Sequence, residues 1–173
     1  MSEIVALDRA RFDEVYSIME QSFPPDEIRP YDEQKTLLSN EFYKVYTLVD
    51  GGRICTVAAT WQFDGVLFIE HLATDPELRG RNMGAQMLGF LTGNEKRIVC
   101  LEVEPPESEL TRRRIAFYER QGFRLNKYSY VQPSISLGRL PVPLMIMTHS
   151  KGIAECEFES IKSILYKEVY KVI

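Results

Sequence analysis

Residues 79 to 84, RGRNMG, combine charge and small residues in a pattern that could hold a phosphate group. Arg79 and Arg81 supply positive charge, and Gly80 and Gly84 have no side chains that would block a ligand. An amphipathic run begins within this stretch, so its first backbone amides would be unpaired donors at a helix N-terminus. Those donors belong to Asn82, Met83 and Gly84. An ordinary strand-to-helix turn with solvated arginines would show the same pattern, so the residues alone leave both interpretations open.

Glu70 is the other residue whose position suggests chemistry, because it is the one carboxylate in the otherwise apolar run of residues 66–74. In a strand it would lie on the same face as Leu72, with His71 on the opposite face. Partial burial would raise the Glu70 pKa toward neutrality, which suits a general base. We therefore predict that Glu70 removes a proton from a substrate, with pairing to an arginine as the structural alternative.

Composition limits the other kinds of chemistry. The 173 residues suit one domain spanning 1–173, and 45% hydrophobic with 27% charged residues is typical of a globular protein. A formal net charge of −4 gives no global attraction to nucleic acid or anionic lipid. Three widely spaced cysteines and two histidines argue against a disulfide framework and a metal site. No apolar stretch approaches the ~20 residues that a helix needs to cross a bilayer. We expect a cytoplasmic protein without metal, nucleic-acid or membrane partners.

Hydrophobic periodicity predicts the elements that would position these residues. Strands are expected over residues 3–7, 43–49, 53–63, 66–74, 97–103, 124–132 and 142–148. Five helices are expected. Two precede the second strand, one from after Asp8 to about Gln21 and one over 31–40. A third runs from 83 to about 92 with Asn82 as its N-cap, a fourth ends at Gln121, and the last covers 153–169. An antiparallel meander, followed by a helix that joins neighbouring strands, gives a mixed sheet and so an α+β or mixed α/β fold of about seven strands. The last helix could cover the sheet or form a dimer.

Two segments resemble the GNAT superfamily of N-acetyltransferases. IEHLATDPELRGRNMGAQML, residues 69–88, is similar to its acetyl-CoA signature, which reads Gln or Arg, two residues, Gly, one residue, then Gly or Ala. Arg79 and Gly84 match the two ends, and Asn82 replaces the first glycine; Asn tolerates left-handed backbone conformations better than most residues do. IAFYERQGF, residues 115–123, resembles a later helix of the family, and the predicted element order matches the GNAT fold over nearly the whole chain.

The resemblance implies that the chain uses acetyl-CoA and transfers an acetyl group to an amine. Pantetheine would lie along the end of the central strand and pair with backbone groups there. Those groups belong to Leu72, Ala73 and Thr74. The pyrophosphate would be held by the turn and helix start that follow. The residues of that cradle are Arg79, Gly80, Arg81, Asn82, Met83 and Gly84. Tyr118, which stands at the position of the family's tyrosine, would donate a proton to the departing thiolate.

The chain departs from the family before that tyrosine. Thr111 and Arg114 stand where family members usually carry Asn and Ala, which argues against an Asn-type contact to the cofactor at this point. Arg112, Arg113 and Arg114 could reach the 3′-phosphate end of the cofactor, or they could form a solvated basic helix face.

The acceptor site is expected between the SFPPDEIRP segment, the helix after it and the loop over residues 133–141. Candidate lining residues, chosen from their positions, are Phe23, Glu27, Tyr31 and Glu102. We predict an N-acetyltransferase that acts on a small-molecule primary amine, as a monomer or homodimer. The alternatives are a protein or peptide amine acceptor, and a catalytically silent acyl-CoA-binding regulatory module.

Overall fold

The computed structural model describes residues 1–172, and over that range it contains seven strands and five α-helices in nearly the predicted order. The strands are β1 (Glu3–Ala6), β2 (Tyr43–Asp50), β3 (Arg53–Phe63), β4 (Val66–Thr74), β5 (Ile98–Val103), β6 (Phe123–Gln132) and β7 (Val142–His149). The helices are α1 (Phe12–Glu20), α2 (Tyr31–Thr36), α3 (Met83–Thr92), α4 (Glu109–Arg120) and α5 (Glu155–Ile164). The predicted tail helix ends in a π-helical turn over Leu165–Val169.

All strands belong to one mixed sheet in the order β1-β2-β3-β4-β5-β7-β6. Neighbours pair antiparallel except β4 and β5, which run parallel and are joined by α3. The predicted mixed sheet is therefore confirmed. The position of β7 between β5 and β6 was not predicted, because hydrophobic periodicity identifies strands but does not say which strands pair.

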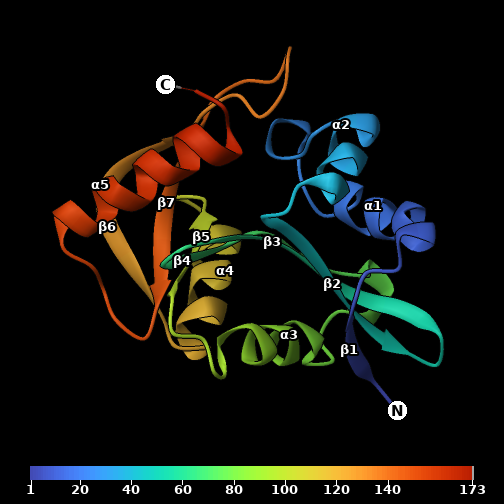
Figure 1. Ribbon diagram of the computed structural model, residues 1–173. Coiled ribbons are helices and arrows are strands. Elements are labelled where there is room, and N and C mark those ends of the chain that lie inside the picture. The colour runs from blue at the N-terminus through green and yellow to red at the C-terminus, as the bar shows by residue number, and fades with distance from the viewer. Residues whose placement is uncertain (173) are drawn as a thin grey trace.

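Helices cover both faces of the sheet (Figure 1). One face buries apolar side chains of α1 and α5, such as Val15 and Phe158, in a cluster with the sheet. The other face packs against α3 and α4 through residues such as Met87 and Ile115. Because the apolar stripe of α5 is buried within this chain, the tail helix covers the sheet, as one of the two interpretations of the sequence predicted.

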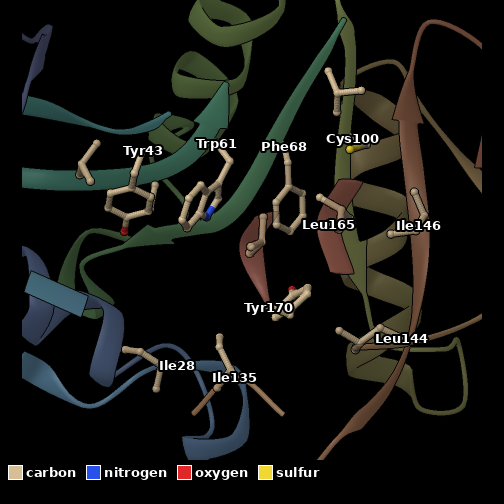
Figure 2. Close-up of a cluster of buried hydrophobic side chains, with 14 of the residues drawn as sticks. Ile28, Tyr43, Trp61, Phe68, Cys100, Ile135, Leu144, Ile146, Leu165 and Tyr170 are labelled. Atoms are coloured by element: carbon tan, nitrogen blue, oxygen red, sulfur yellow. The ribbon is translucent and has the colours of Figure 1, made fainter. Parts of the chain in front are cut away.

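Figure 2 shows the larger core where the tail meets the sheet. Trp61 and Phe68 come from the central strands, and Leu165 and Tyr170 come from the end of the chain. Tyr170 is 7% exposed even though it lies only three residues from the last residue of the chain. The C-terminal segment is thus part of the core and reaches the centre of the molecule.

Three further features concern membrane spans, metal ligands and cysteines. None of the helices described within residues 1–172 is long and apolar enough to cross a membrane. Among the same residues, no group of three or more His, Cys, Asp or Glu side chains could hold a metal ion. Cys55 and Cys100 are buried and Cys156 is exposed, and all three are free thiols.

Candidate active site

The sheet opens where β4 and β5 diverge. Their pairing extends from Val66 opposite Ile98 only as far as Ile69 opposite Leu101. Past that point β5 continues to pair with β7, while β4 stays paired with β3 up to Thr74. The edge of β4 that faces β5 therefore has backbone groups without strand partners. A cavity of about 500 Å³ lies in this opening.

This cavity, here called the central cavity, brings together most of the predicted site residues. It is lined by Phe23, Glu27, Glu70, Leu72, Ala73, Thr74, Arg79, Gly84, Glu102 and Tyr118. Five different parts of the chain contribute to it: the turn after α1, β4, the turn that leads into α3, β5 and α4. Leu72, Ala73 and Thr74 form the open edge of β4, where the sequence predicted a partner for pantetheine.

A β-bulge changes the direction of the side chains around Glu70. His71 lies opposite Ala59 and Ile69 lies opposite Thr60, so Glu70 has no opposite residue on β3. A bulge interrupts the alternation of faces along a strand. As a result, Nδ1 of His71 lies 3.7 Å from Oε2 of Glu70, and the prediction that these side chains point to opposite faces is wrong.

Glu70 forms a buried ion pair. Its Oε1 accepts a hydrogen bond from Nη1 of Arg29 at 2.8 Å, and its Oε2 accepts one from Nε1 of Trp61 at 3.0 Å. The Glu70 side chain is 2% exposed and that of Arg29 is 6% exposed. Burial pushes the Glu70 pKa upward, but Arg29, His71 and Trp61 together outweigh it and lower the pKa below its usual value. The expectation of a raised Glu70 pKa is therefore wrong, because a buried guanidinium favours the carboxylate.

Glu102 has the opposite electrostatic environment. Burial raises its pKa to about 8, although hydroxyl groups of Tyr130 and Tyr170 donate hydrogen bonds to the carboxyl group and oppose that rise. The Tyr170 hydroxyl lies 2.8 Å from each of the two carboxyl oxygens. Glu70 and Glu27 add negative charge nearby and raise the pKa further. Glu102 is thus a carboxyl group that holds its proton near neutral pH.

Glu27 lies on the turn between α1 and α2, where it lines the central cavity and faces β5. Burial raises its pKa to about 7, and the negative charge of Glu104 adds to that shift. Arg114 opposes it, and it also binds Glu104 at 3.4 Å. The backbone carbonyl of Glu27 lies 2.7 Å from Nε2 of His71, which fixes the turn against β4.

Tyr118 lies on α4, with its ring packed against Phe117 and Phe123. Gly122 adopts a φ of 88°, which ends α4 and turns Phe123 back over the helix. Burial raises the Tyr118 pKa to about 12, so its hydroxyl stays protonated at neutral pH. Tyr118 therefore packs against its aromatic neighbours and also lines the central cavity.

Tyr31 is the one predicted acceptor residue that lies away from the central cavity. It is the first residue of α2, and its ring packs against Phe12 and Tyr16 of α1. Its hydroxyl group bonds to Asp13 and accepts a hydrogen bond from Lys35. Aromatic packing between the two helices therefore keeps Tyr31 out of the central cavity, and its place in the acceptor site stays a prediction.

The turn at residues 79–84 forms a second, connected cavity of about 620 Å³, here called the cradle. Gly80 has a φ of 80° and Asn82 a φ of 62°, so both occupy the left-handed region. This is the conformation that Gly adopts freely and Asn tolerates. Asn82 is the N-cap of α3 as predicted, but its side chain makes no capping hydrogen bond. The first amides of the helix are consequently not occupied by their own cap.

Gly84, the second small residue of the cradle, faces α4, where an added Cβ would make ordinary van der Waals contact. A Cβ atom added to Gly84 would lie 3.4 Å from the Phe117 ring and 3.8 Å from the Thr74 hydroxyl group. Asp75 and Glu77, the acidic residues just before the cradle, are both bound by Arg53 at 2.6 Å. Arg53 therefore offsets part of the nearby negative charge.

The two departures from the family pattern have structural roles. Thr111 forms a reciprocal capping box with Ser108 at the start of α4. Arg114 lines both the central cavity and the cradle. Arg113 lines the cradle as well, whereas Arg112 donates to the carbonyl group of Pro106 and lies outside both cavities.

A third cavity of about 600 Å³, here called the outer cavity, lies on the other side of the buried ion pair. It is lined by α2, by residues 134–138 of the loop between β6 and β7, and by the end of the chain. Arg29, Trp61 and Tyr170 line this cavity while donating hydrogen bonds to Glu70 and Glu102, which line the central cavity. One layer of side chains thus separates the two spaces.

Four residues of the site were not predicted. Arg29 and Trp61 fix Glu70, and Tyr130 and Tyr170 fix Glu102. The only signal for Arg29 was that it is the one arginine in the proline-rich segment SFPPDEIRP, which was already expected to shape a pocket. The two tyrosines lie on β6 and in the tail, and no local pattern connects them to β5.

Comparisons with known proteins agree with this geometry. The family model of the acetyltransferase (GNAT) domain matches residues 41–125. A solved structure from Bacteroides thetaiotaomicron, described as a "Putative acetyltransferase from GNAT family", is 31% identical, with 99% of each chain covered and a TM-score of 0.87. A curated Bacillus subtilis protein named "Putative acetyltransferase YjbC" is 28% identical over 111 residues, which is 63% of this chain and 56% of that protein.

A more distant structure shares only the fold. The ribosomal-protein-S18-alanine N-acetyltransferase from Escherichia coli is 18% identical, with 90% of this chain and 97% of that chain covered and a TM-score of 0.65. Identity at that level leaves the acceptor of this chain undetermined.

Proposed function

The chain belongs to the GNAT family of acetyltransferases, and on this premise we propose that it transfers an acetyl group from acetyl-CoA to a primary amine. The observation that carries the proposal is the opening between β4 and β5, which leads directly into the cradle at residues 79–84. Together they offer a row of free backbone groups that ends at a positively charged helix start. A long ligand with an anionic end fits this arrangement.

The residues present fit acetyl-CoA. The left-handed Asn82 and the bare Gly84 leave the first amides of α3 accessible, and Arg79 and Arg81 add positive charge beside them. We infer that residues 79–84 hold the pyrophosphate and that Leu72, Ala73 and Thr74 hold the pantetheine. When bound, acetyl-CoA supplies an acetyl group activated as a thioester.

The carboxyl groups of the central cavity would take the proton from the substrate ammonium. Glu27, with a pKa of about 7, has the proton affinity of an effective base at neutral pH. Glu70, the predicted base, stays ionised beside Arg29, so we assign it the role of a fixed charge that orients the amine directly or through water. Glu102 would remain protonated at neutral pH and shape the cavity.

Tyr118 is the proposed proton donor. Its hydroxyl group stays protonated because burial raises its pKa to about 12, and it lines the central cavity opposite β4. As the new C–N bond forms and the C–S bond breaks, Tyr118 would give its proton or a hydrogen bond to the sulfur. Free amide groups at the β4 edge would stabilise the developing oxyanion.

The acceptor would bind in the central cavity, where Glu27 lies near the open edge of β4. The SFPPDEIRP segment, one of the three segments expected from the sequence, lines this cavity through Phe23 and Glu27. A volume of about 500 Å³ is in the usual range for small-molecule sites, which favours a small amine over a folded protein. A protein or peptide amine is the alternative acceptor, since the E. coli structure of the same fold carries a name that specifies a protein substrate.

Two measurements test the proposal. Acetyl-CoA at millimolar concentration should raise the melting temperature, because a ligand that binds only the folded state stabilises it. A panel of primary amines should then release free thiol in the presence of acetyl-CoA and the protein. An unchanged melting curve would reject the cofactor assignment. Binding without thiol release for any small or peptide amine would favour the catalytically silent module instead.

A further inference from the structure

His71 is a buried polar side chain that the proposed reaction does not use. It follows Glu70 in β4 and is 2% exposed. Phe23, which lines the central cavity, packs its ring edge-on against the imidazole, with 4.7 Å between the ring centroids. His71 itself lines neither the central cavity nor the cradle. Its ring therefore lies behind the wall of the central cavity, and contact with a bound substrate does not explain it.

The hydrogen bond to Glu27 determines which imidazole nitrogen carries the proton. A carbonyl oxygen only accepts hydrogen bonds, so Nε2 of His71, 2.7 Å from the Glu27 carbonyl oxygen, is the donor. Burial lowers the pKa of His71 and Arg29 adds to that effect, although Glu70 and the Glu27 carbonyl group oppose it. The imidazole is consequently neutral near pH 7, and its Nδ1 carries a lone pair.

This lone pair has no partner. Among residues 1–172, Nδ1 of His71 is buried without a hydrogen bond, and Oε2 of Glu70, which is also an acceptor, lies 3.7 Å away. A buried polar atom without a partner lowers stability. A phenylalanine ring would avoid this cost and could still pack against Phe23. Stability alone therefore does not account for a histidine here, and the Nε2 donor is the feature that an apolar ring lacks.

The position of the Glu27 carboxyl group depends on its backbone. Within residues 1–172, the carboxyl oxygens of Glu27 form no hydrogen bond or ion pair. The turn that carries this residue is bound to β6 and the loop after it through Asp26, which accepts hydrogen bonds from the Gln132 side chain at 3.0 Å and the Leu140 amide at 2.9 Å. His71 binds Glu27 itself and so connects the turn to β4, the strand whose open edge borders the central cavity.

We propose that His71 is a positioning residue for Glu27: its Nε2–H group holds the turn so that the Glu27 carboxyl group lies near the open edge of β4. This inference rests on the proposed function, in which Glu27 takes the proton of the acceptor amine. A displacement of about 1 Å can lower an enzymatic rate about 100-fold, so one hydrogen bond to the turn that carries the base has a measurable effect. The same bond keeps Glu27 in the buried position that raises its pKa.

Two substitutions separate this hydrogen bond from the packing of the ring. His71→Phe keeps an aromatic ring beside Phe23 but removes the donor, whereas His71→Gln keeps an N–H donor but has no ring. In His71→Phe, kcat/KM at pH 8 should fall about 10- to 100-fold, mostly through kcat. The Kd for acetyl-CoA, measured by calorimetry, should not change, because His71 lines neither cavity that would hold this ligand. His71→Gln should recover most of the rate.

The acidic limb of kcat/KM gives a second readout. The groups that face Glu27 are Glu104 and Asp26, which raise its pKa together with burial, and Arg114, which lowers it. Loosening of the turn in His71→Phe would give water access to the Glu27 carboxyl group. The limb should therefore move to lower pH in His71→Phe and stay near pH 7 in His71→Gln.

Hydrogen exchange measures the turn without any turnover. Backbone amides of residues 22–30 should exchange about 10-fold faster in His71→Phe than in the unaltered chain, and at nearly the unaltered rate in His71→Gln. The proposal is overturned if either this exchange or kcat/KM is unchanged in His71→Phe, or if His71→Gln loses as much activity as His71→Phe; the last result would assign His71 to packing alone. Absence of thiol release by the unaltered chain with every amine would instead reject the proposed function and the catalytic role of His71 together, so the two failures are distinguishable.

Discussion

The carboxyl groups of the central cavity share a side-chain type but differ in proton affinity. Glu70 is held as a carboxylate by Arg29 and Trp61, whereas burial raises the pKa of Glu27 to about 7 and that of Glu102 to about 8. A base is most effective when its pKa lies close to the working pH. At the residue scale, the proton acceptor is therefore set by the partners of each carboxyl group.

The acidic limb of the pH profile of kcat/KM tests this assignment. Glu27 must lose its proton to act, so kcat/KM should fall as the pH drops below about 7. Glu27→Gln should lower kcat/KM about 10²-fold near pH 8, as expected for loss of a general base. Glu70→Gln should lower the rate at all pH values without moving the limb, because Glu70 is ionised throughout this range.

Glu104→Gln is a control with a defined sign. The charge of Glu104 raises the Glu27 pKa, so its removal should lower that pKa and move the acidic limb to lower pH. Initial-rate measurements from pH 5.5 to 9 would compare the three variants. If the limb near pH 7 persists in Glu27→Gln, another group is the base.

At the scale of an element, the conformation of Asn82 allows α3 to begin with accessible amides. A φ of 62° at Asn82 turns the chain into the helix, and the Asn82 side chain makes no hydrogen bond to those amides. The family's glycine reaches this conformation without strain, and Asn reaches it at a smaller cost than residues with larger or branched side chains. The departure from the family pattern is thus conservative in backbone geometry.

Substitutions at Asn82 should follow this backbone requirement. Asn82→Gly should leave the free energy of unfolding within about 0.5 kcal/mol and keep the affinity for coenzyme A. Asn82→Ala should lower the free energy of unfolding by about 1 kcal/mol, because Ala is strained in the left-handed region, and should weaken coenzyme A binding. Urea unfolding and calorimetry measure the two effects. If both variants lose the same free energy of unfolding and the same affinity for coenzyme A, the Asn side chain matters and not its backbone conformation.

At the scale of the whole molecule, the C-terminal segment connects the core to the site. Tyr170 follows the π-helical turn and donates hydrogen bonds to Glu102 on β5, 68 residues away in the chain. The carbonyl group of Val169 lies 3.4 Å from Nη2 of Arg29, so the same segment also touches the partner of Glu70. The tail thereby forms the wall between the central and outer cavities and stabilises the fold at the same time.

Tyr170→Phe should destabilise the protein in a pH-dependent way. Burial raises the Glu102 pKa above the unfolded value of about 4.3, so Glu102 contributes stability that declines as the pH rises from about 4.3 through 8. Loss of the Tyr170 hydroxyl raises the Glu102 pKa further and removes a donor to the charged form. We expect a loss of about 1–3 kcal/mol in the free energy of unfolding at pH 9 and a smaller loss at pH 6.

Tyr166→Phe is the matched control in the same segment. Its hydroxyl group donates to the carbonyl group of Val131 at an exposed position, so its removal should have a small effect that does not depend on pH. Urea unfolding at pH 6 and pH 9 would compare the two variants. If Tyr170→Phe loses the same free energy at both pH values, Glu102 does not titrate as described.

The sequence by itself determined the elements and the cradle, because both depend on local patterns. Hydrophobic periodicity located the strands, and residues 79–84 marked the start of α3. Only the tertiary structure decided the protonation of the carboxyl groups. The Glu70 pKa depends on Arg29, 41 residues away in the chain, and that of Glu102 on Tyr130 and Tyr170, which are 28 and 68 residues away. A pKa is set by neighbours in space, and neither the β4 bulge nor the pairing of β7 with β5 leaves a local signal.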